Sequence, residues 1–145
     1  MKLVVAGTGY VGLVAGVCFA HKGHDVTCVD TDENKVKSME AGICPIYEQD
    51  LEALMQENYA AGRLHYTTDY AKAYKNPDAI FIGVGTPEQP DGSADLSYIA
   101  TVSRQIAENI EKDCLVVVKS TVPVGTNDKV EQFIHDFLKR RDVKI

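Results

Sequence analysis

A glycine-rich segment near the start of the chain has the spacing of a phosphate-binding turn. Gly7, Gly9 and Gly12 fit the pattern G-x-G-x-x-G, directly after the apolar run Leu3 to Ala6 and at the start of a helical pattern. In this setting the first glycine permits a tight turn, the second lets the backbone approach a pyrophosphate, and the third lets helix and strand pack closely. The free amides and the positive dipole at the helix N-terminus would meet the phosphate charge. The segment therefore predicts a dinucleotide-binding loop.

An acidic residue stands where a dinucleotide site needs one. Asp30 follows Gly7 by 23 positions, at the end of the second apolar run, where a carboxylate can accept hydrogen bonds from ribose hydroxyls. Because an acid there would repel a 2′-phosphate, NAD is favoured over NADP as the cofactor. Capping of the helix that follows Thr31-Asp32 is the alternative role for Asp30. Lys35, one turn into that helix, can reach the ribose edge or remain a solvated lysine.

Two further loops carry hydroxyl groups at the same predicted end of the sheet. Segment 83–87 follows the fourth apolar run, and segment 119–126 follows the fifth. Thr86 is placed to touch the nicotinamide ribose or the pyrophosphate, and Thr121 is placed to face the nicotinamide end of the cleft. Helix capping is the alternative for the hydroxyls of segment 119–126, and it is the favoured role for Asp95.

Five apolar runs must position these loops. They extend over Lys2 to Ala6, Asp25 to Asp30, Leu64 to Thr67, Ala79 to Val84 and Cys114 to Ser120. Helical patterns separate the runs, and strands that alternate with helices pair in parallel through right-handed crossovers. We therefore expect an α/β fold, a Rossmann-type doubly wound parallel sheet with helices on both faces. Residues 1–145 are expected to form one such domain, with ligands at the carboxyl ends of the strands.

Apolar spacing also predicts the buried helix faces and several helix boundaries. The expected buried stripes are Val11, Val14, Ala15, Cys18 and Phe19, then Ile99, Val102, Ile106 and Ile110, then Val130, Phe133, Ile134, Phe137 and Leu138. Two helices are expected between the second and third strands, over 32–41 and around 50–61, with Glu48 capping the second. Pro123 is expected in the first turn of the last helix. Residues 143–145 are expected to begin a further strand.

Charge and composition exclude several other kinds of site. The net charge of -6 argues against a nucleic-acid surface, which needs clustered Lys and Arg. No apolar stretch approaches the roughly 20 residues that span a membrane, and no leader precedes the glycine loop, so we expect a cytoplasmic protein. The four cysteines form no C-x-x-C pair and no histidines cluster with them, so no metal site is predicted. Cys18 and Cys28 are expected to be buried, and Cys44 is a weak candidate nucleophile.

Together, the motifs resemble the UDP-glucose/GDP-mannose dehydrogenase family over nearly the whole chain. The matching motifs are G-x-G-Y-V-G at 7–12, G-x-x-P-x-x-E-x-x-L at 42–51, T-P followed by D-G and D within 86–95, and S-T-V-P-x-G-T at 120–126. The resemblance implies NAD as cofactor, with contacts from Val11, Asp30, Lys35, Thr86 and Thr121. Tyr10 and the three glycines complete the predicted cofactor site. One departure is local: where the family usually has Glu-Pro-Gly-Leu, this chain has Glu48-Gln49-Asp50-Leu51.

The resemblance also implies an activity for a full-length enzyme. Proteins of this family oxidise the sugar C6 alcohol to a carboxylate in two hydride transfers to two NAD molecules, through a covalent adduct on a cysteine. Thr121 would have the catalytic role of helping to hold a water near the reacting carbon, together with an acidic residue beyond position 145. The cysteine and most sugar-nucleotide contacts lie in a central helix and a C-terminal domain. We therefore expect residues 1–145 to bind NAD but to be inactive alone, and the full-length enzyme to be a homodimer that binds UDP-glucose.

Three alternatives stay open from the sequence. UDP-N-acetylmannosamine or GDP-mannose could replace UDP-glucose, although the Tyr-Val-Gly and Glu48-x-x-Leu51 details favour UDP-glucose. A non-catalytic NAD-sensing regulatory module would share the glycine loop but not both of the motifs at 86–92 and 120–123. Another hydroxyacid or 3-hydroxyacyl dehydrogenase would need a catalytic histidine or lysine after the fifth or sixth strand, and Lys119 is the nearby candidate.

Overall fold

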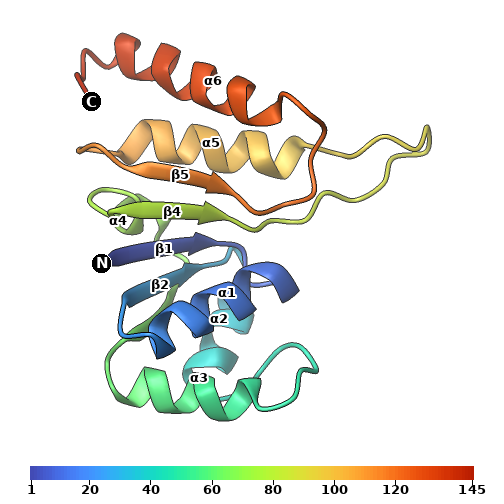
Figure 1. Cartoon of the computed structure of the whole chain (residues 1–145), viewed down its shortest axis with the longest axis vertical. Coiled ribbons are helices and arrows are strands. Elements are labelled where there is room, and N and C mark those ends of the chain that lie inside the picture. The colour runs from blue at the N-terminus through green and yellow to red at the C-terminus, as the bar shows by residue number, and fades with distance from the viewer.

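The computed structural model describes residues 1–145 as one parallel sheet flanked by helices (Figure 1). The strands are β1 (Lys2–Ala6), β2 (Asp25–Val29), β3 (Leu64–Thr67), β4 (Ala79–Ile82) and β5 (Leu115–Val118). The helices are α1 (Tyr10–His21), α2 (Glu33–Glu40), α3 (Leu51–Ala60), α4 (Tyr70–Ala73), α5 (Ser97–Asn109) and α6 (Thr126–Arg140). The strand order is β3-β2-β1-β4-β5. The expected Rossmann-type architecture is confirmed.

The sheet register brings the predicted loops to one edge. β1 lies at the centre, and Ala6 at its end pairs with Val29 of β2 and with Ile82 of β4. Ile82 pairs in turn with Val118 of β5. The carboxyl ends of these four strands are therefore aligned, and the chain between β4 and α5 projects from that edge (Figure 1).

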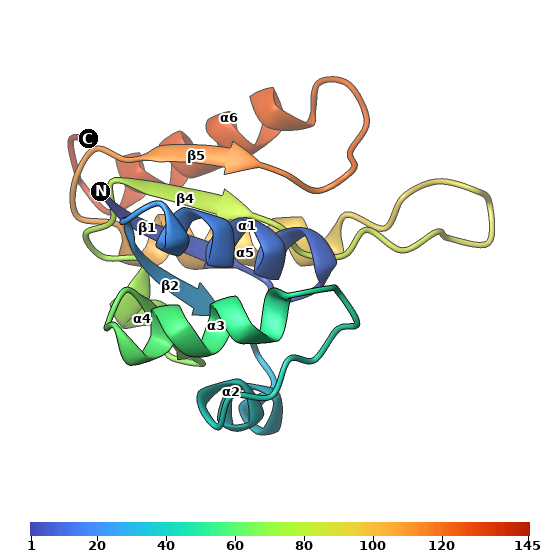
Figure 2. The ribbon, with the colours of Figure 1, turned by 60° about the horizontal axis from the view of Figure 1, so that its bottom comes forward.

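Alternate residues of β1 build two separate cores. Leu3 and Val5 pack with α1, α2 and α3 on one face, and Val4 and Ala6 pack with α4, α5 and α6 on the other. Figure 2 shows α1 and α5 on opposite sides of the sheet. Strands that are buried on both faces read as continuous apolar runs, which is why the sequence located them. No helix is both long and apolar enough to cross a lipid bilayer.

The predicted buried face of α1 is wrong in part, since Val14 and Phe19 do pack against the core but are not fully buried. Cys18 and Val11 are exposed, and the buried positions are Gly12, Leu13, Gly16, Val17 and Ala20. This helix is apolar on all sides, so spacing alone does not distinguish its two apolar stripes. The stripe with the smaller residues faces the sheet because it permits a closer approach. A β-carbon at Gly16 would lie 2.7 Å from the Cys28 sulfur.

The apolar stripes of the later helices agree better with the structure. All four predicted positions of α5 are buried, and in α6 the residues Val130, Ile134 and Leu138 are buried. Phe133 is 43% exposed, since it lies at the border of the stripe. The short α4 was not predicted, because a single turn is too short to establish a period.

Three boundaries differ from the expectation because local hydrogen bonds end the elements. β5 ends at Val118, where the next two amides both turn to the carbonyl of Ile82 at 2.7 and 3.2 Å. Pro123 lies outside α6, which begins after Gly125, a residue with a φ of 90°. Residues 143–145 form no strand, and the Val143 amide instead closes the end of α6.

Candidate cofactor site

The three glycines of the loop after β1 meet different surroundings. Gly7 has a φ of 101°, and a β-carbon there would lie 3.0 Å from the carbonyl oxygen of Gly83. A β-carbon at Gly12 would lie 2.1 Å from the carbonyl oxygen of Gly7. A β-carbon at Gly9, the N-cap of α1, would meet nothing within 4 Å. Two glycines are thus required by packing, and the third leaves open space in front of the helix N-terminus.

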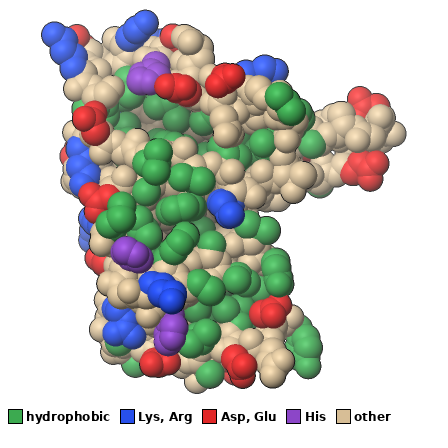
Figure 3. Space-filling view, viewed as in Figure 1, with side chains coloured by type: hydrophobic (Ala, Val, Ile, Leu, Met, Phe, Trp, Pro, Cys, Tyr) green, Lys and Arg blue, Asp and Glu red, His purple; other side chains and the backbone are tan.

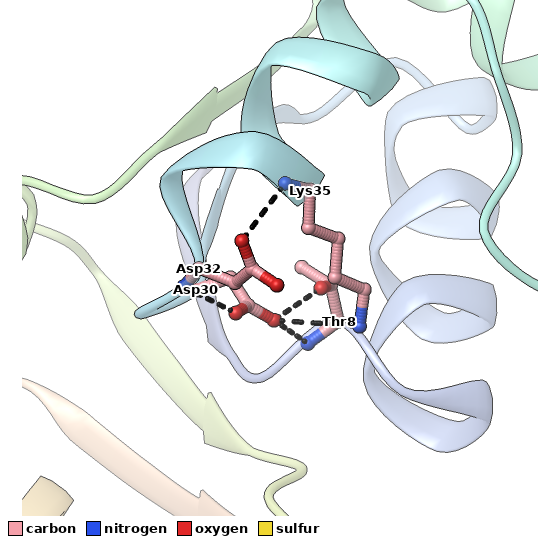
Figure 4. Close-up of polar contacts among 4 residues, drawn as sticks. All are labelled: Thr8, Asp30, Asp32 and Lys35. Atoms are coloured by element: carbon pink, nitrogen blue, oxygen red, sulfur yellow. Dashed lines mark hydrogen bonds and ion pairs between the residues drawn. The ribbon is translucent and has the colours of Figure 1, made fainter.

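Asp30 lies against this loop and is held by several donors (Figure 4). Its Oδ2 accepts hydrogen bonds from the hydroxyl of Thr8 and, at 3.3 Å, from the Thr8 amide. Its Oδ1 accepts from the Asp32 amide at 2.9 Å. The side chain that caps α2 is Asp32, which accepts from the Lys35 amide at 3.1 Å. Asp30 therefore faces the glycine loop. The helix-capping role, which was the predicted alternative for Asp30, belongs to Asp32.

The surroundings of Asp30 keep its carboxylate ionised. Its side chain is 15% exposed, and this partial burial pushes its pKa upward. Hydrogen bonds from Thr8 and Asp32 and the ammonium group of Lys35, which is 3.6 Å from Oδ2, outweigh the burial. The net effect is a pKa below the ordinary value of 3.8. Asp30 is therefore negatively charged at neutral pH and fixed in direction.

A cleft of about 250 Å³ opens between the glycine loop, the end of β2 and the first half of α5. Gly7, Gly9 and Asp30 line it, as predicted for a shared site. Sequence reasoning missed other lining residues, namely Thr8, Thr31, Thr68, Tyr70, Tyr98, Thr101 and Gln105. The last three are spaced i, i+3 and i+7 along α5, so a polar stripe beside the apolar stripe was the available signal.

The loops after β4 and β5 form a second polar group at the same edge. The Thr86 hydroxyl donates to the backbone carbonyl of Thr121 at 2.9 Å, and the Ser120 hydroxyl donates to the carbonyl of Val84 at 2.6 Å. The Thr121 side chain is exposed. Neither Thr86 nor Thr121 lines the cleft beside Asp30. The structure therefore brings these two predicted residues together, apart from the glycine loop.

The helices that follow these two loops have no side-chain cap, because α5 begins after Leu96 and α6 begins after Gly125. The Thr126 hydroxyl donates to the carbonyl of Pro123 at 2.8 Å, within the turn that begins α6. Asp95 was expected to cap α5, but the N-cap is Leu96, and Asp95 instead accepts from the Ser97 amide at 2.9 Å from one residue earlier. Glu88 and Ala94 are joined by an antiparallel bridge in the projecting segment. Acidic side chains lie at the tip of this projection (Figure 3).

Tyr10 and Val11 begin α1 and are exposed, at 58% and 44%. Glu48 was expected to cap α3, but this helix has no side-chain cap, and the Glu48 carboxylate beside the Tyr10 phenol raises the pKa of Tyr10. α3 begins after Asp50, which has a φ of 63° and makes no side-chain cap. Asp50 occupies the position of the glycine in the usual Glu-Pro-Gly-Leu pattern. The local departure of this sequence therefore places an aspartate in backbone geometry that favours glycine.

The four cysteines are all free thiols, and they differ in burial. Burial raises the pKa of the Cys28 thiol to about 12 and that of Cys114 to about 11. The Cys44 thiol donates to the carbonyl of Ile46 at 3.1 Å. Since the thiolate is the nucleophilic form, Cys28 and Cys114 are unreactive at neutral pH. No three His, Cys, Asp or Glu side chains come together in a group that could hold a metal ion.

Known proteins are similar to this chain in sequence and in fold. The sequence model described as "UDP-glucose/GDP-mannose dehydrogenase family, NAD binding domain" matches residues 1–145. A UDP-glucose 6-dehydrogenase of Rhizobium meliloti is 49% identical over 100% of this chain and 33% of its own length. The chain thus spans about a third of the length of that curated relative.

Two solved structures from different organisms superpose closely on the chain. A GDP-mannose dehydrogenase from Pseudomonas aeruginosa matches with a TM-score of 0.89 and 42% identity, covering 94% of this chain and 32% of that one. A UDP-glucose dehydrogenase from Pyrobaculum islandicum matches with a TM-score of 0.88 and 40% identity, covering 94% of this chain and 33% of that one. The chain belongs to the UDP-glucose/GDP-mannose dehydrogenase family, of which it is the NAD-binding domain.

Proposed function

We propose that this chain is the cofactor domain of a UDP-glucose 6-dehydrogenase, which oxidises UDP-glucose to UDP-glucuronate with two molecules of NAD. The observation that carries the proposal is the ionised Asp30 carboxylate, held beside the open helix N-terminus at Gly9. The amides of that turn suit a pyrophosphate, and the carboxylate suits a ribose. A 2′-phosphate at the same position would meet the Asp30 charge, which favours NAD over NADP.

The residues present fit NAD along its length. The empty space at Gly9 would admit the pyrophosphate, and the cleft of about 250 Å³ beside Asp30 would admit the adenosine half. At this adenosine end, NAD would also contact Lys35, Tyr10 and Val11. The linked loops of Thr86 and Thr121 would serve the nicotinamide half at the carboxyl ends of β4 and β5. When bound, NAD would supply the hydride acceptor for oxidation of an alcohol.

The choice of UDP-glucose rests on relatives and not on a contact in this domain. The curated relative described above is named a UDP-glucose 6-dehydrogenase, whereas a solved relative acts on GDP-mannose. Since both resemble this domain, the sugar is recognised elsewhere in the protein. We propose that a central helix and a C-terminal domain supply the sugar-nucleotide site and the catalytic cysteine, and that Thr121 helps to position a water there.

The full-length enzyme is proposed to be a cytoplasmic homodimer that supplies UDP-glucuronate for polysaccharide biosynthesis. The alternative of an NAD-sensing regulatory module would keep the Asp30 site but would make no use of the Thr86 and Thr121 loops. Family membership supports the dehydrogenase. The two hypotheses separate in the full-length protein, because only the dehydrogenase would form NADH when given UDP-glucose.

Calorimetric titration of the 145-residue chain with NAD and with NADP tests the cofactor site. We expect NAD to bind more tightly than NADP and Asp30→Ala to weaken NAD binding about tenfold, through loss of a charge-assisted hydrogen bond. Asp25→Ala is the matched control, because Asp25 lies at the opposite end of β2, where it pairs with His65 at 3.2 Å. Equal affinities of the Asp30 and Asp25 variants would contradict the proposed site. NADH formation by this chain alone with UDP-glucose would contradict the expectation that it is inactive.

A further inference from the structure

Thr8 fills the first variable position of the glycine motif, yet it is one of the few buried polar residues of the chain. Its exposed fraction is 1%. Its hydroxyl and its amide both donate to Oδ2 of Asp30, across 22 positions of sequence. The motif itself requires no particular side chain here, since only the glycines are dictated by packing and turn geometry. A buried hydroxyl aimed at the acid is therefore a feature of this chain beyond the motif.

We infer that Thr8 is a positioning residue, which occupies Oδ2 of Asp30 and thereby presents Oδ1 as the acceptor for the cofactor ribose. This inference rests on the proposed NAD site. Thr8 itself acts on the carboxylate and not on the cofactor.

The hydrogen-bond capacity of the carboxylate supports this division of roles. A carboxylate has about four acceptor positions, two on each oxygen. On Oδ2 the hydroxyl and amide of Thr8 take both positions, and the Lys35 ammonium lies 3.6 Å away. On Oδ1 the Asp32 amide takes one position at 2.9 Å. One acceptor position remains, and it is on Oδ1.

The Thr8 contact also affects the charge and the mobility of Asp30. After burial, the Thr8 hydroxyl is the largest influence on the carboxyl group, and it acts to lower the pKa. Because the donor is a short side chain on a turn held by Gly7, it limits rotation of the carboxylate as well. Without the hydroxyl, Oδ2 would regain acceptor capacity, and the carboxylate would be freer to rotate.

The test compares variants of Thr8 by two measurements on the 145-residue chain. Thr8→Val removes the hydroxyl with little change of shape, and Thr8→Ser keeps it. Thr27→Val is the control, because Thr27 lies in β2 away from the loop. The first measurement is the titration midpoint of the Asp30 carboxyl by carbon-13 NMR without cofactor. The second is the dissociation constant of NAD by calorimetry at neutral pH.

We expect Thr8→Val to raise the Asp30 midpoint and to weaken NAD binding about tenfold, the loss of about one charge-assisted hydrogen bond. Thr8→Ser should stay close to the unmodified chain in both measurements, and Thr27→Val should not differ from it. Thr8→Ala, which lacks the hydroxyl and is smaller, repeats the test if valine disturbs the fold.

An unchanged midpoint in folded Thr8→Val, unchanged NAD affinity, or failure of Thr8→Ser to restore both values would overturn the inference. A failure of the proposed function gives a different result. In that case the unmodified chain would not bind NAD, while the NMR midpoints would still decide whether Thr8 controls the state of Asp30.

Discussion

Alanine substitutions at Gly9 and Gly12 should separate cofactor binding from folding, although both glycines belong to one motif. A β-carbon at Gly12 would lie 2.1 Å from the Gly7 carbonyl oxygen, whereas ordinary contact begins at 3.4 Å. The two nearest atoms belong to the Gly7 backbone, so the glycine loop and α1 would have to move apart. At Gly9 the added carbon meets nothing within 4 Å, and the φ of -74° suits alanine.

The expected magnitudes follow from these surroundings. Gly12→Ala is an overpacking substitution in a close contact and should cost about 2 to 3 kcal/mol of unfolding free energy. For a chain of this size that corresponds to a drop in Tm of about 5 to 10 °C. Gly9→Ala gains about 0.4 to 1 kcal/mol from the less flexible unfolded chain, and it loses a similar amount because alanine is a poor N-cap. Its net effect on stability should be below about 0.5 kcal/mol.

Gly9→Ala should impair NAD binding although it leaves stability nearly unchanged. The new methyl group would occupy the space in front of the helix N-terminus and should weaken NAD binding at least about tenfold. Urea unfolding and calorimetric titration of the two variants measure both quantities. A Gly9→Ala variant with normal NAD affinity, or a Gly12→Ala variant with normal stability, would refute the reasoning.

Three further substitutions test other parts of the structure. Asp50→Gly should raise the unfolding free energy by about 0.5 to 1 kcal/mol, because it relieves a left-handed backbone at a non-glycine residue, and no change in urea unfolding would contradict this. Arg141→Ala should cost about 1 to 2 kcal/mol, because its guanidinium donates to two carbonyls near the end of α5 at 2.7 and 3.1 Å, and Arg140→Ala is the exposed control with little expected change in Tm. The folded state lowers the pKa of Asp30 below 3.8. At pH values near the folded and unfolded pKa values, the unfolded chain therefore binds more protons than the folded chain. The stability from Asp30 is thus present above about pH 4 and is lost as the pH falls through the folded pKa, and Asp30→Asn should flatten this part of the unfolding profile.

The sequence predicted the strands and the loop positions well because those features depend on local patterns. Strands that are buried on both faces are apolar throughout, and the glycines mark turns wherever the chain must reverse or approach closely. The position of Asp30 after β2 followed from its spacing of 23 positions from Gly7 and from the end of the second apolar run. The roles of Tyr10, Val11, Thr86 and Thr121 toward NAD remain predictions.

Features that depend on a choice between equal local alternatives were predicted poorly. α1 offers two apolar stripes, and the sheet selects the one with Gly12 and Gly16 because it packs more closely. Glu48 could have capped α3, but it meets Tyr10 only when the loop folds back over α1. Residue spacing alone predicts neither of these two contacts.

By itself, the sequence determined the order of the elements, the edge of the sheet at which the loops meet and the chemistry available there. These follow from periodicity, glycine placement and the constant direction of parallel strands. Tertiary structure alone decided which of those groups touch, such as Thr8 with Asp30 and Thr86 with the Thr121 backbone. The physical reason is that such contacts join residues 22 and 35 positions apart, whose separation is set by strand pairing and packing and not by their neighbours in the chain.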